Sequence, residues 1–197
     1  MAVIQQTRFA SVDALRGITV AAMLLVNNPG DWGHVYAPLL HADWHGCTPT
    51  DLVFPFFLFI VGVSIALGIV PRVEAGADIS LLRRTVLIRA AKIIGLGLAL
   101  HLLSFLLMDK EWFRPWGVLQ RIGLCFAVVG FLALHSKVRL QWAVITGLLL
   151  GYWGLLLIGG SFEPWINLAS RVDTALLGPL LYQFDPATGL GHDPEGL

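Results

Sequence analysis

The sequence predicts an all-α membrane protein, a polytopic bundle of about five transmembrane helices with its N-terminus in the cytoplasm. The chain is 56% hydrophobic and 13% charged, whereas about a quarter of the residues are charged in a typical soluble domain. Its mean hydropathy is +0.75, and its apolar residues gather in runs close to the ~20 residues that cross a bilayer. The predicted surroundings are therefore a lipid bilayer, and the net charge of zero gives no indication of a nucleic-acid partner.

Each apolar run is bounded by polar or helix-breaking residues. The first run ends where Pro29 and Gly30 stop a helix. The second contains Pro55 about one turn from its start, where a membrane helix tolerates it. The tail after the last run is rich in Gly, Pro and Asp, and we expect it to be partly helical over 164–177. The predicted spans are residues 12–28, 52–70, 85–108, 117–134 and 140–159.

The charges of the loops predict the orientation of the spans. Basic residues lie in the N-terminal arm and near the loops after the second and fourth runs, whereas acidic residues predominate in the other loops and in the tail. Lys and Arg mark the cytoplasmic side, so the loop after the first run and the tail 160–197 should be periplasmic. The basic residues that set this prediction include Arg8, Arg16, Arg72, Arg83, Arg84, Lys137 and Arg139.

The loop over residues 41–51 concentrates reactive side chains at a predicted water–bilayer boundary. His41 and His45 are four residues apart, and Asp51 stands at the start of the second run. One interpretation is a histidine–carboxylate pair, in which the carboxylate orients an imidazole that acts as base or nucleophile. A second is a metal site in which an aspartate joins the two histidines. A third is a solvated loop in which Asp51 caps the second helix. The spacing leaves all three open.

Polar residues of the first run have similar alternatives. Asn27, at its end, could donate a hydrogen bond to a developing oxyanion or could simply end a helix. Asp13 and Arg16 lie three residues apart and are predicted to pair on one helix face. Arg16 could also meet an anionic ligand from the cytoplasm.

Three further arginines are candidates for binding an anion. Arg121 begins the fourth run on the predicted outer side, where an ionisable residue indicates either a function or a structural pair with an outer carboxylate. Arg83 and Arg84 either mark the cytoplasmic side and contact lipid headgroups, or hold the phosphates of a cytoplasmic cofactor.

Several motifs follow one another along nearly the whole chain. They are RFASVDALRG at 8–17, VN at 26–27, LHADW at 40–44, GCTPTDLVFPFF at 46–57, GVLQRIG at 117–123 and DPEGL at 193–197. This ordered set resembles the heparan-α-glucosaminide N-acetyltransferase family, including its bacterial members. The opening motif alone is weak because other membrane acyltransferases begin similarly, but the ordered set is specific.

The resemblance implies that an acetyl group passes from cytoplasmic acetyl-CoA, the co-substrate, to an amino sugar or glycan on the far side of the membrane. It implies His41 as the active-site histidine, with Asn27 and Asp51 lining the site. Members of the family have more spans than this chain. We therefore expect residues 1–197 to be the N-terminal part of a longer acyltransferase domain in a bacterial inner membrane. The candidates for holding the cofactor's phosphates are Arg16, Arg83, Arg84 and Arg121.

The chemistry suits these residues. His41 could deprotonate the incoming ammonium or carry the acetyl group itself, Asp51 would orient it, and Asn27 would donate to the oxyanion. Two alternatives are a permease for amino sugars or cell-wall fragments, and an inactive truncated scaffold. A permease would place polar or broken helices near the middle of several spans, which runs two, four and five hardly show. The oligomeric state stays open, with a homodimer among the options.

Overall fold

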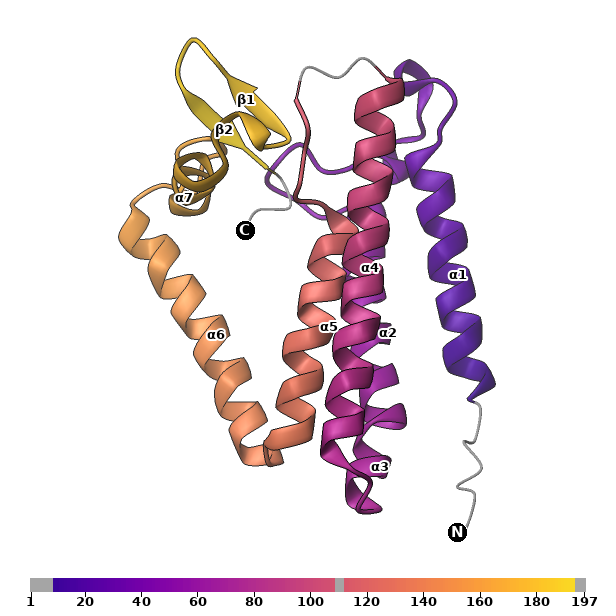
Figure 1. The fold of residues 1–197 in the computed structure, drawn as a ribbon. Coiled ribbons are helices and arrows are strands. Elements are labelled where there is room, and N and C mark those ends of the chain that lie inside the picture. Colours follow the sequence, from indigo (N-terminus) through magenta and orange to yellow (C-terminus); the bar gives the residue numbers. More distant parts are fainter. Residues whose placement is uncertain (1–8, 109–111, 194–197) are drawn as a thin grey trace. The chain divides into compact units, whose positions relative to one another are not determined.

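The structure is a computed structural model that describes residues 9–108 and 112–193. Arg8 and residues 194–197, which belong to the motifs above, lie outside the described residues. The chain divides into two compact units, Met1–Leu82 and Arg83–Leu197, and Figure 1 labels the helices and strands of each. Within the described residues, five helices are long and apolar enough to cross a membrane, which confirms the predicted all-α fold class.

The observed helices follow the predicted spans closely, with one difference at the start of the third. That helix, α4, begins at Ile79 rather than at residue 85. Asp78 precedes it, and its carboxylate accepts a hydrogen bond from the Ser80 backbone N–H at 2.8 Å. An aspartate in this place is a helix-start signal, which the following arginines concealed from a search for apolar runs. The five helices are α1 Ala10–Asn27, α2 Val53–Gly68, α4 Ile79–Leu107, α5 Val118–His135 and α6 Val138–Gly159.

In the first unit, α1 packs against α2. The predicted pair is confirmed: Arg16 Nη1 lies 3.4 Å from Asp13 Oδ1. The same guanidinium donates through Nη2 to Ser64 Oγ of α2 at 3.1 Å, so it also joins the two helices. The remaining elements of this unit are the short helix α3 Val70–Glu74 and three 3-10 turns, η1 Trp32–His34, η2 Ala37–Leu39 and η3 Thr50–Leu52.

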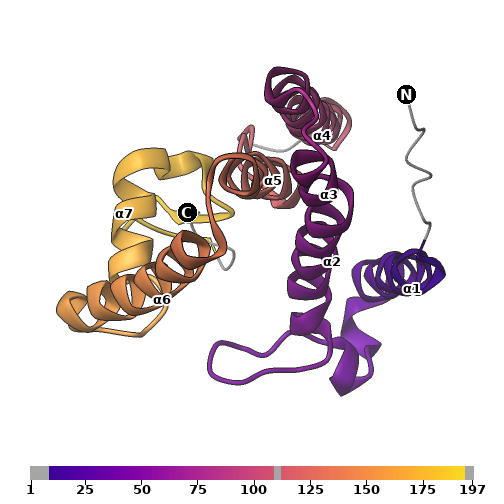
Figure 2. The same cartoon turned by 90° about the horizontal axis from the view of Figure 1, so that it is seen from below.

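In the second unit, α4 and α5 lie side by side (Figures 1 and 2) and approach closely through glycines. A Cβ atom on Gly130 would lie 2.8 Å from Val86 Cγ1, and one on Gly123 would lie 3.0 Å from the carbonyl oxygen of Ala90. Val86 is only 1% exposed. Small residues allow such close packing between membrane helices, where van der Waals contact replaces the hydrophobic effect.

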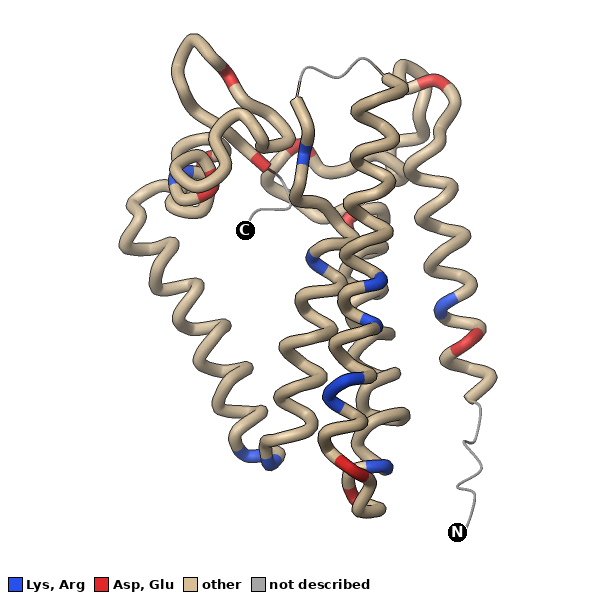
Figure 3. The backbone as a smooth tube through the Cα atoms, in the orientation of Figure 1, with Lys and Arg blue, Asp and Glu red and all other residues tan. Residues whose placement is uncertain are grey.

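The last span is followed by a small polar substructure. No residue of α6 is buried, and Figure 3 shows charged residues on it only in its first turn, as a lipid-facing helix would have. The predicted helix in the tail is present as α7 Leu168–Leu177. It begins later than residue 164 because the Asn167 side chain caps it, accepting from the Ser170 N–H at 2.8 Å.

A hairpin of two strands follows α7 and was not predicted. Strand β1 Gln183–Asp185 pairs antiparallel with β2 Leu190–His192. The turn between them is held by Asp185, which accepts from the Ala187 N–H at 2.9 Å and from Thr188 Oγ1 at 2.7 Å. Asp-Pro and a following glycine are ordinary turn signals, but strands of three residues are too short to show an alternating pattern.

Candidate functional site

The connection between α1 and α2 folds back on itself through residues with special backbone requirements. Gly30 ends the α1 region with φ +80°, and Gly46 adopts φ +144°, both in the range that favours glycine. At Gly46 a Cβ atom would also come within 3.3 Å of Ala42 Cβ. This turn returns Thr48 to the backbone of Leu40, whose carbonyl oxygen lies 2.7 Å from Thr48 Oγ1.

The sequence Thr48-Pro49-Thr50-Asp51 starts the helical region of α2. Pro49 already has helical angles, φ −54° and ψ −32°, and proline suits the first helical position. The Asp51 carboxylate reaches back and accepts from the Thr48 N–H at 2.7 Å through Oδ2. This is one half of a capping box, in which an acidic residue three positions on satisfies the N–H of the cap. The carboxylate of Asp51 thus satisfies one backbone N–H at the start of this helical region, in the way that the third interpretation of the loop expected.

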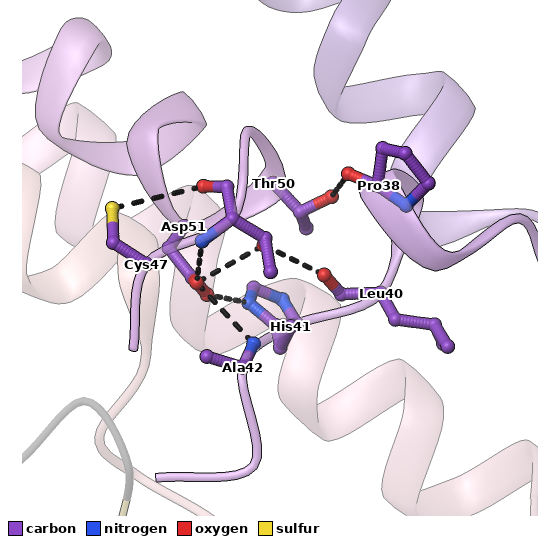
Figure 4. A network of polar contacts seen from close by, with 8 residues as sticks. Pro38, Leu40, His41, Ala42, Cys47, Thr50 and Asp51 are labelled. Carbon is purple, nitrogen blue, oxygen red and sulfur yellow. Dashed lines mark hydrogen bonds and ion pairs between the residues drawn. The ribbon is translucent and has the colours of Figure 1, made fainter. Parts of the chain in front are cut away.

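The same carboxylate also holds His41, as Figure 4 shows. His41 Nδ1 lies 2.6 Å from Asp51 Oδ1, while the next backbone N–H, of Ala42, donates to Oδ2 at 3.3 Å. The side chains are 67% and 26% exposed. If Nδ1 carries the proton and donates it to the carboxylate, the lone pair of Nε2 is left for an incoming group. Capping and imidazole orientation, which the sequence posed as alternatives, are thus both performed by Asp51.

A second histidine–aspartate pair lies in the same connection and was not predicted. His34 Nδ1 is 2.5 Å from Asp31 Oδ2, and Asp31 Oδ1 accepts from the Gly33 N–H at 2.8 Å. The hydrogen bonds from His34 and Gly33 lower the pKa of the Asp31 carboxyl. Both side chains are largely exposed, and the contact spans a single short turn. This pair therefore lacks the additional contacts that fix Asp51, and it serves as a natural comparison for it.

The geometry gives no support to a metal site. Across residues 9–108 and 112–193, no three His, Cys, Asp or Glu side chains stand close enough together to hold an ion. His41 is directed instead to a single carboxylate.

Asn27 is the last residue of α1 and is exposed. Among the described residues, no hydrogen bond joins its amide to His41 or Asp51. The neighbouring Asn28 bonds back to its own helix, from Nδ2 to the carbonyl oxygen of Leu24 at 2.9 Å. The structure therefore brings His41 and Asp51 together and leaves Asn27 as a separate candidate.

Within each unit, the candidate arginines lie at different positions along the length of the helices. From Arg16 to Asn27, α1 rises roughly 16 Å at 1.5 Å per residue, so Arg16 stands well below the helix end. In the second unit Arg83 and Arg84 are exposed, whereas Arg121 follows Gln120, whose side chain would meet a Cβ atom on Gly97. Gly97 lies roughly 20 Å along α4 from Arg83. One phosphate group therefore cannot contact Arg121 together with Arg83 or Arg84.

Arg121 is held within a buried cluster. Its side chain is 9% exposed, with Nη2 3.9 Å from Asp193 Oδ2 and the guanidinium 5.6 Å from the ring of Trp116. The predicted carboxylate partner is thus Asp193. Arg114, which sequence reasoning missed, also contacts Asp193, donating from Nη2 at 2.9 and 3.1 Å. Arg114 and Asp193 are 79 residues apart, so no short sequence pattern indicates that they are in contact.

Comparisons with known proteins agree with these motifs. The family model described as heparan-alpha-glucosaminide N-acetyltransferase, catalytic, matches residues 8–175. The heparan-alpha-glucosaminide N-acetyltransferase of Homo sapiens is 36% identical over 129 residues, which are 64% of this chain and 19% of the human protein. The Mus musculus protein of the same name is 34% identical over 127 residues, with the same two shares. The chain thus matches about a fifth of the length of these curated relatives. Since the family model extends from the first helix into α7, this chain belongs to the heparan-alpha-glucosaminide N-acetyltransferase family.

Proposed function

We propose that this protein is a transmembrane acetyltransferase that takes acetyl from cytoplasmic acetyl-CoA and passes it to the amine of an amino sugar or glycan on the opposite side of the membrane. Family membership supports the reaction class. The observation that carries the assignment of the site is the contact of 2.6 Å between His41 Nδ1 and Asp51 Oδ1 beside an exposed imidazole. The positive charges of alternate loops support the orientation.

In direct transfer, His41 acts as a general base. Nε2 takes a proton from the amino group of the sugar while the amine nitrogen attacks the thioester carbonyl, and the new C–N bond forms. The tetrahedral intermediate then collapses, the C–S bond breaks, and CoA leaves as a thiolate that takes up a proton. Asp51 stabilises the imidazolium and keeps Nδ1 as the donor.

In two-step transfer, His41 acts as a nucleophile. Nε2 attacks the thioester carbonyl, the C–S bond breaks and CoA leaves. The acetyl group stays on Nε2 until the sugar amine attacks its carbonyl carbon, and the bond from that carbon to Nε2 then breaks. Both routes develop negative charge on the carbonyl oxygen, and Asn27 is our candidate for donating a hydrogen bond to it. Its place at the exposed end of α1, the helix that precedes the His41 loop, supports this role.

Cations on the predicted cytoplasmic side would bind the phosphates of the co-substrate. Arg16, Arg83 and Arg84 are our candidates, since all three are exposed and lie on the predicted cytoplasmic side. Arg121 was proposed for the same role, but its contacts with Asp193 and Trp116 suit it better to a structural one. Arg16 is predicted on the cytoplasmic side of the membrane and His41 on the opposite side. A co-substrate that contacts both must therefore be extended, as a nucleotide joined to a pantetheine arm is.

The test is to incubate purified protein with acetyl-CoA labelled in the acetyl group, with and without glucosamine. We expect the wild type to release CoA and to yield N-acetylated sugar, and His41→Ala to be slower by at least about 10³-fold because it lacks the base or nucleophile. Label retained on the wild type without an acceptor would identify the two-step route.

His34→Ala is the matched control, because it removes an imidazole bound to an aspartate from the same connection. We expect it to keep nearly full activity. Equal losses in the two variants, or full activity in His41→Ala, would contradict the catalytic assignment. Uptake of amino sugar into vesicles without acetylation would favour a permease.

A further inference from the structure

We infer that Thr48 is a positioning residue of the His41–Asp51 pair, acting on both partners through one side chain. The inference rests on the proposed acetyl transfer for its effect on turnover. Its structural basis is independent of that reaction, because it concerns only how the imidazole and the carboxylate are held.

Thr48 makes three contacts that converge on the pair. Its backbone N–H donates to Asp51 Oδ2 at 2.7 Å. Its hydroxyl oxygen lies 3.0 Å from the same Oδ2 and 2.7 Å from the carbonyl oxygen of Leu40. A hydroxyl has one proton to donate, so it is shared between two acceptors. One acceptor belongs to the carboxylate, and the other belongs to the residue that directly precedes His41.

These contacts determine which oxygen of Asp51 faces the imidazole. Oδ2 receives the Thr48 N–H, the Thr48 hydroxyl and the Ala42 N–H, so Oδ1 remains for His41 Nδ1. The His41 side chain is 67% exposed and therefore has little packing to fix its rotamer. Its direction depends on the hydrogen bond to Oδ1, and the carboxylate in turn depends on Thr48.

The hydroxyl is more than the helix start requires. Capping needs the Thr48 N–H, which any residue except proline provides. The hydroxyl adds a contact to the carboxylate and ties the Leu40 carbonyl across the loop. Figure 4 shows Leu40, His41 and Ala42 arranged around the Asp51 carboxylate. Removal of the hydroxyl should therefore loosen the imidazole while the helix remains.

Thr50 provides a matched control in the same turn. Its hydroxyl also donates to a backbone carbonyl across the loop, that of Pro38, at 3.3 Å, and the residue is 3% exposed. No hydrogen bond recorded for its hydroxyl in the described part of the chain reaches His41 or Asp51. Thr50→Val should thus affect stability at least as much as Thr48→Val, without the same effect on the imidazole.

The experiment compares Thr48→Val, Thr48→Ser and Thr50→Val with the wild type. We expect Thr48→Val to lower kcat about tenfold with little change in KM for acetyl-CoA, because the hydrogen bond orients the base and does not bind the substrate. Thr48→Ser should return kcat to within about twofold, since it restores the hydroxyl. An unchanged kcat in Thr48→Val, equal losses in Thr50→Val, or no rescue by serine would overturn the inference.

A second readout separates this inference from the proposed function. The rate at which diethyl pyrocarbonate acylates His41, followed by mass spectrometry, reports the nucleophilicity of Nε2 without any sugar or acetyl-CoA. We expect Thr48→Val to slow it several-fold relative to His34 in the same molecule. If the wild type shows no acetyl transfer but this rate still falls, Thr48 positions His41 and the proposed function is wrong. If transfer occurs and neither rate responds, the inference about Thr48 is wrong.

Discussion

His41 and His192 each lie near carboxylates, but the imidazole of His41 is exposed whereas that of His192 is buried. His41 projects into solvent, with its ring bound to Asp51. His192 is 6% exposed, its Nδ1 lies 3.3 Å from Ser170 Oγ, and its ring packs 5.7 Å from that of Trp165. The contrast teaches that a carboxylate nearby does not by itself make a reactive histidine. An Nε2 that a substrate can reach is also needed, and of these two histidines only His41 is exposed enough to offer it.

The carboxylates of the two regions differ in the same way. Asp51 is held mostly by neighbours from its own loop, ten residues apart or fewer. Asp193 is 1% exposed in its side chain and is held by Arg114 and Arg121, far away in sequence. A buried carboxylate needs such partners, since an unpaired charge at this depth is very costly. Removing the charge of Asp51 should therefore lower the rate of acetyl transfer, whereas removing the charge of Asp193 should lower the stability of the fold.

Asp51→Asn gives the largest effect expected from this contrast. The amide keeps the shape of the side chain, but its NH₂ group favours the wrong tautomer of His41 and cannot stabilise an imidazolium. We expect kcat to fall about 10⁴-fold, as when the orienting carboxylate of a catalytic triad is replaced by an amide. Steady-state acetylation of glucosamine, with folding checked by circular dichroism, measures this.

Asp31→Asn is the control for this change, because Asp31 holds the second exposed imidazole of the loop, that of His34. It should leave kcat within about twofold of the wild type. A comparable loss in this variant would mean that the connection as a whole, and not Asp51, determines the rate.

Asp193→Asn should act on stability. Removing one partner of a buried ion pair leaves the cations Arg114 and Arg121 without their shared carboxylate, and such a loss costs about 3–5 kcal/mol. We expect a lower midpoint of thermal unfolding in detergent, with the acylation rate of His41 unchanged in molecules that are still folded. A shift in that rate without a loss of stability would contradict the distinction between the two regions.

Much of this could be predicted because local signals define it. The five spans follow from runs of apolar residues, and the Asp13–Arg16 pair follows from helical spacing. The contact between His41 and Asp51 was one of three interpretations, and the structure selected it together with helix capping. The roles of Asn27 and of the candidate arginines in catalysis stay predictions.

What could not be predicted depends on distance along the chain or on the length of an element. The hydrogen bond from Arg114 to Asp193 joins residues that are 79 apart in the sequence, and no periodic sequence pattern predicts such a contact. The hairpin over 183–192 has strands of three residues, shorter than an alternating pattern needs for recognition. The pair of His34 and Asp31 has helical spacing but lies in an irregular connection, where spacing alone says little.

The smallest effect concerns pH and should occur at His192 rather than at His41. Burial lowers the pKa of the His192 imidazole, although Asp193 and Asp173 act in the opposite direction. The unfolded chain then binds the proton more readily than the folded one. Stability should therefore fall as the pH drops below the ordinary histidine pKa of about 6.5, and level off below the pKa of His192 in the folded protein.

His192→Asn keeps a polar group for Ser170 but cannot titrate, so the midpoint of its thermal unfolding should depend less on pH between 7 and 5. An equally steep dependence in the variant would show that another group titrates, and would contradict the assignment of this pH effect to His192.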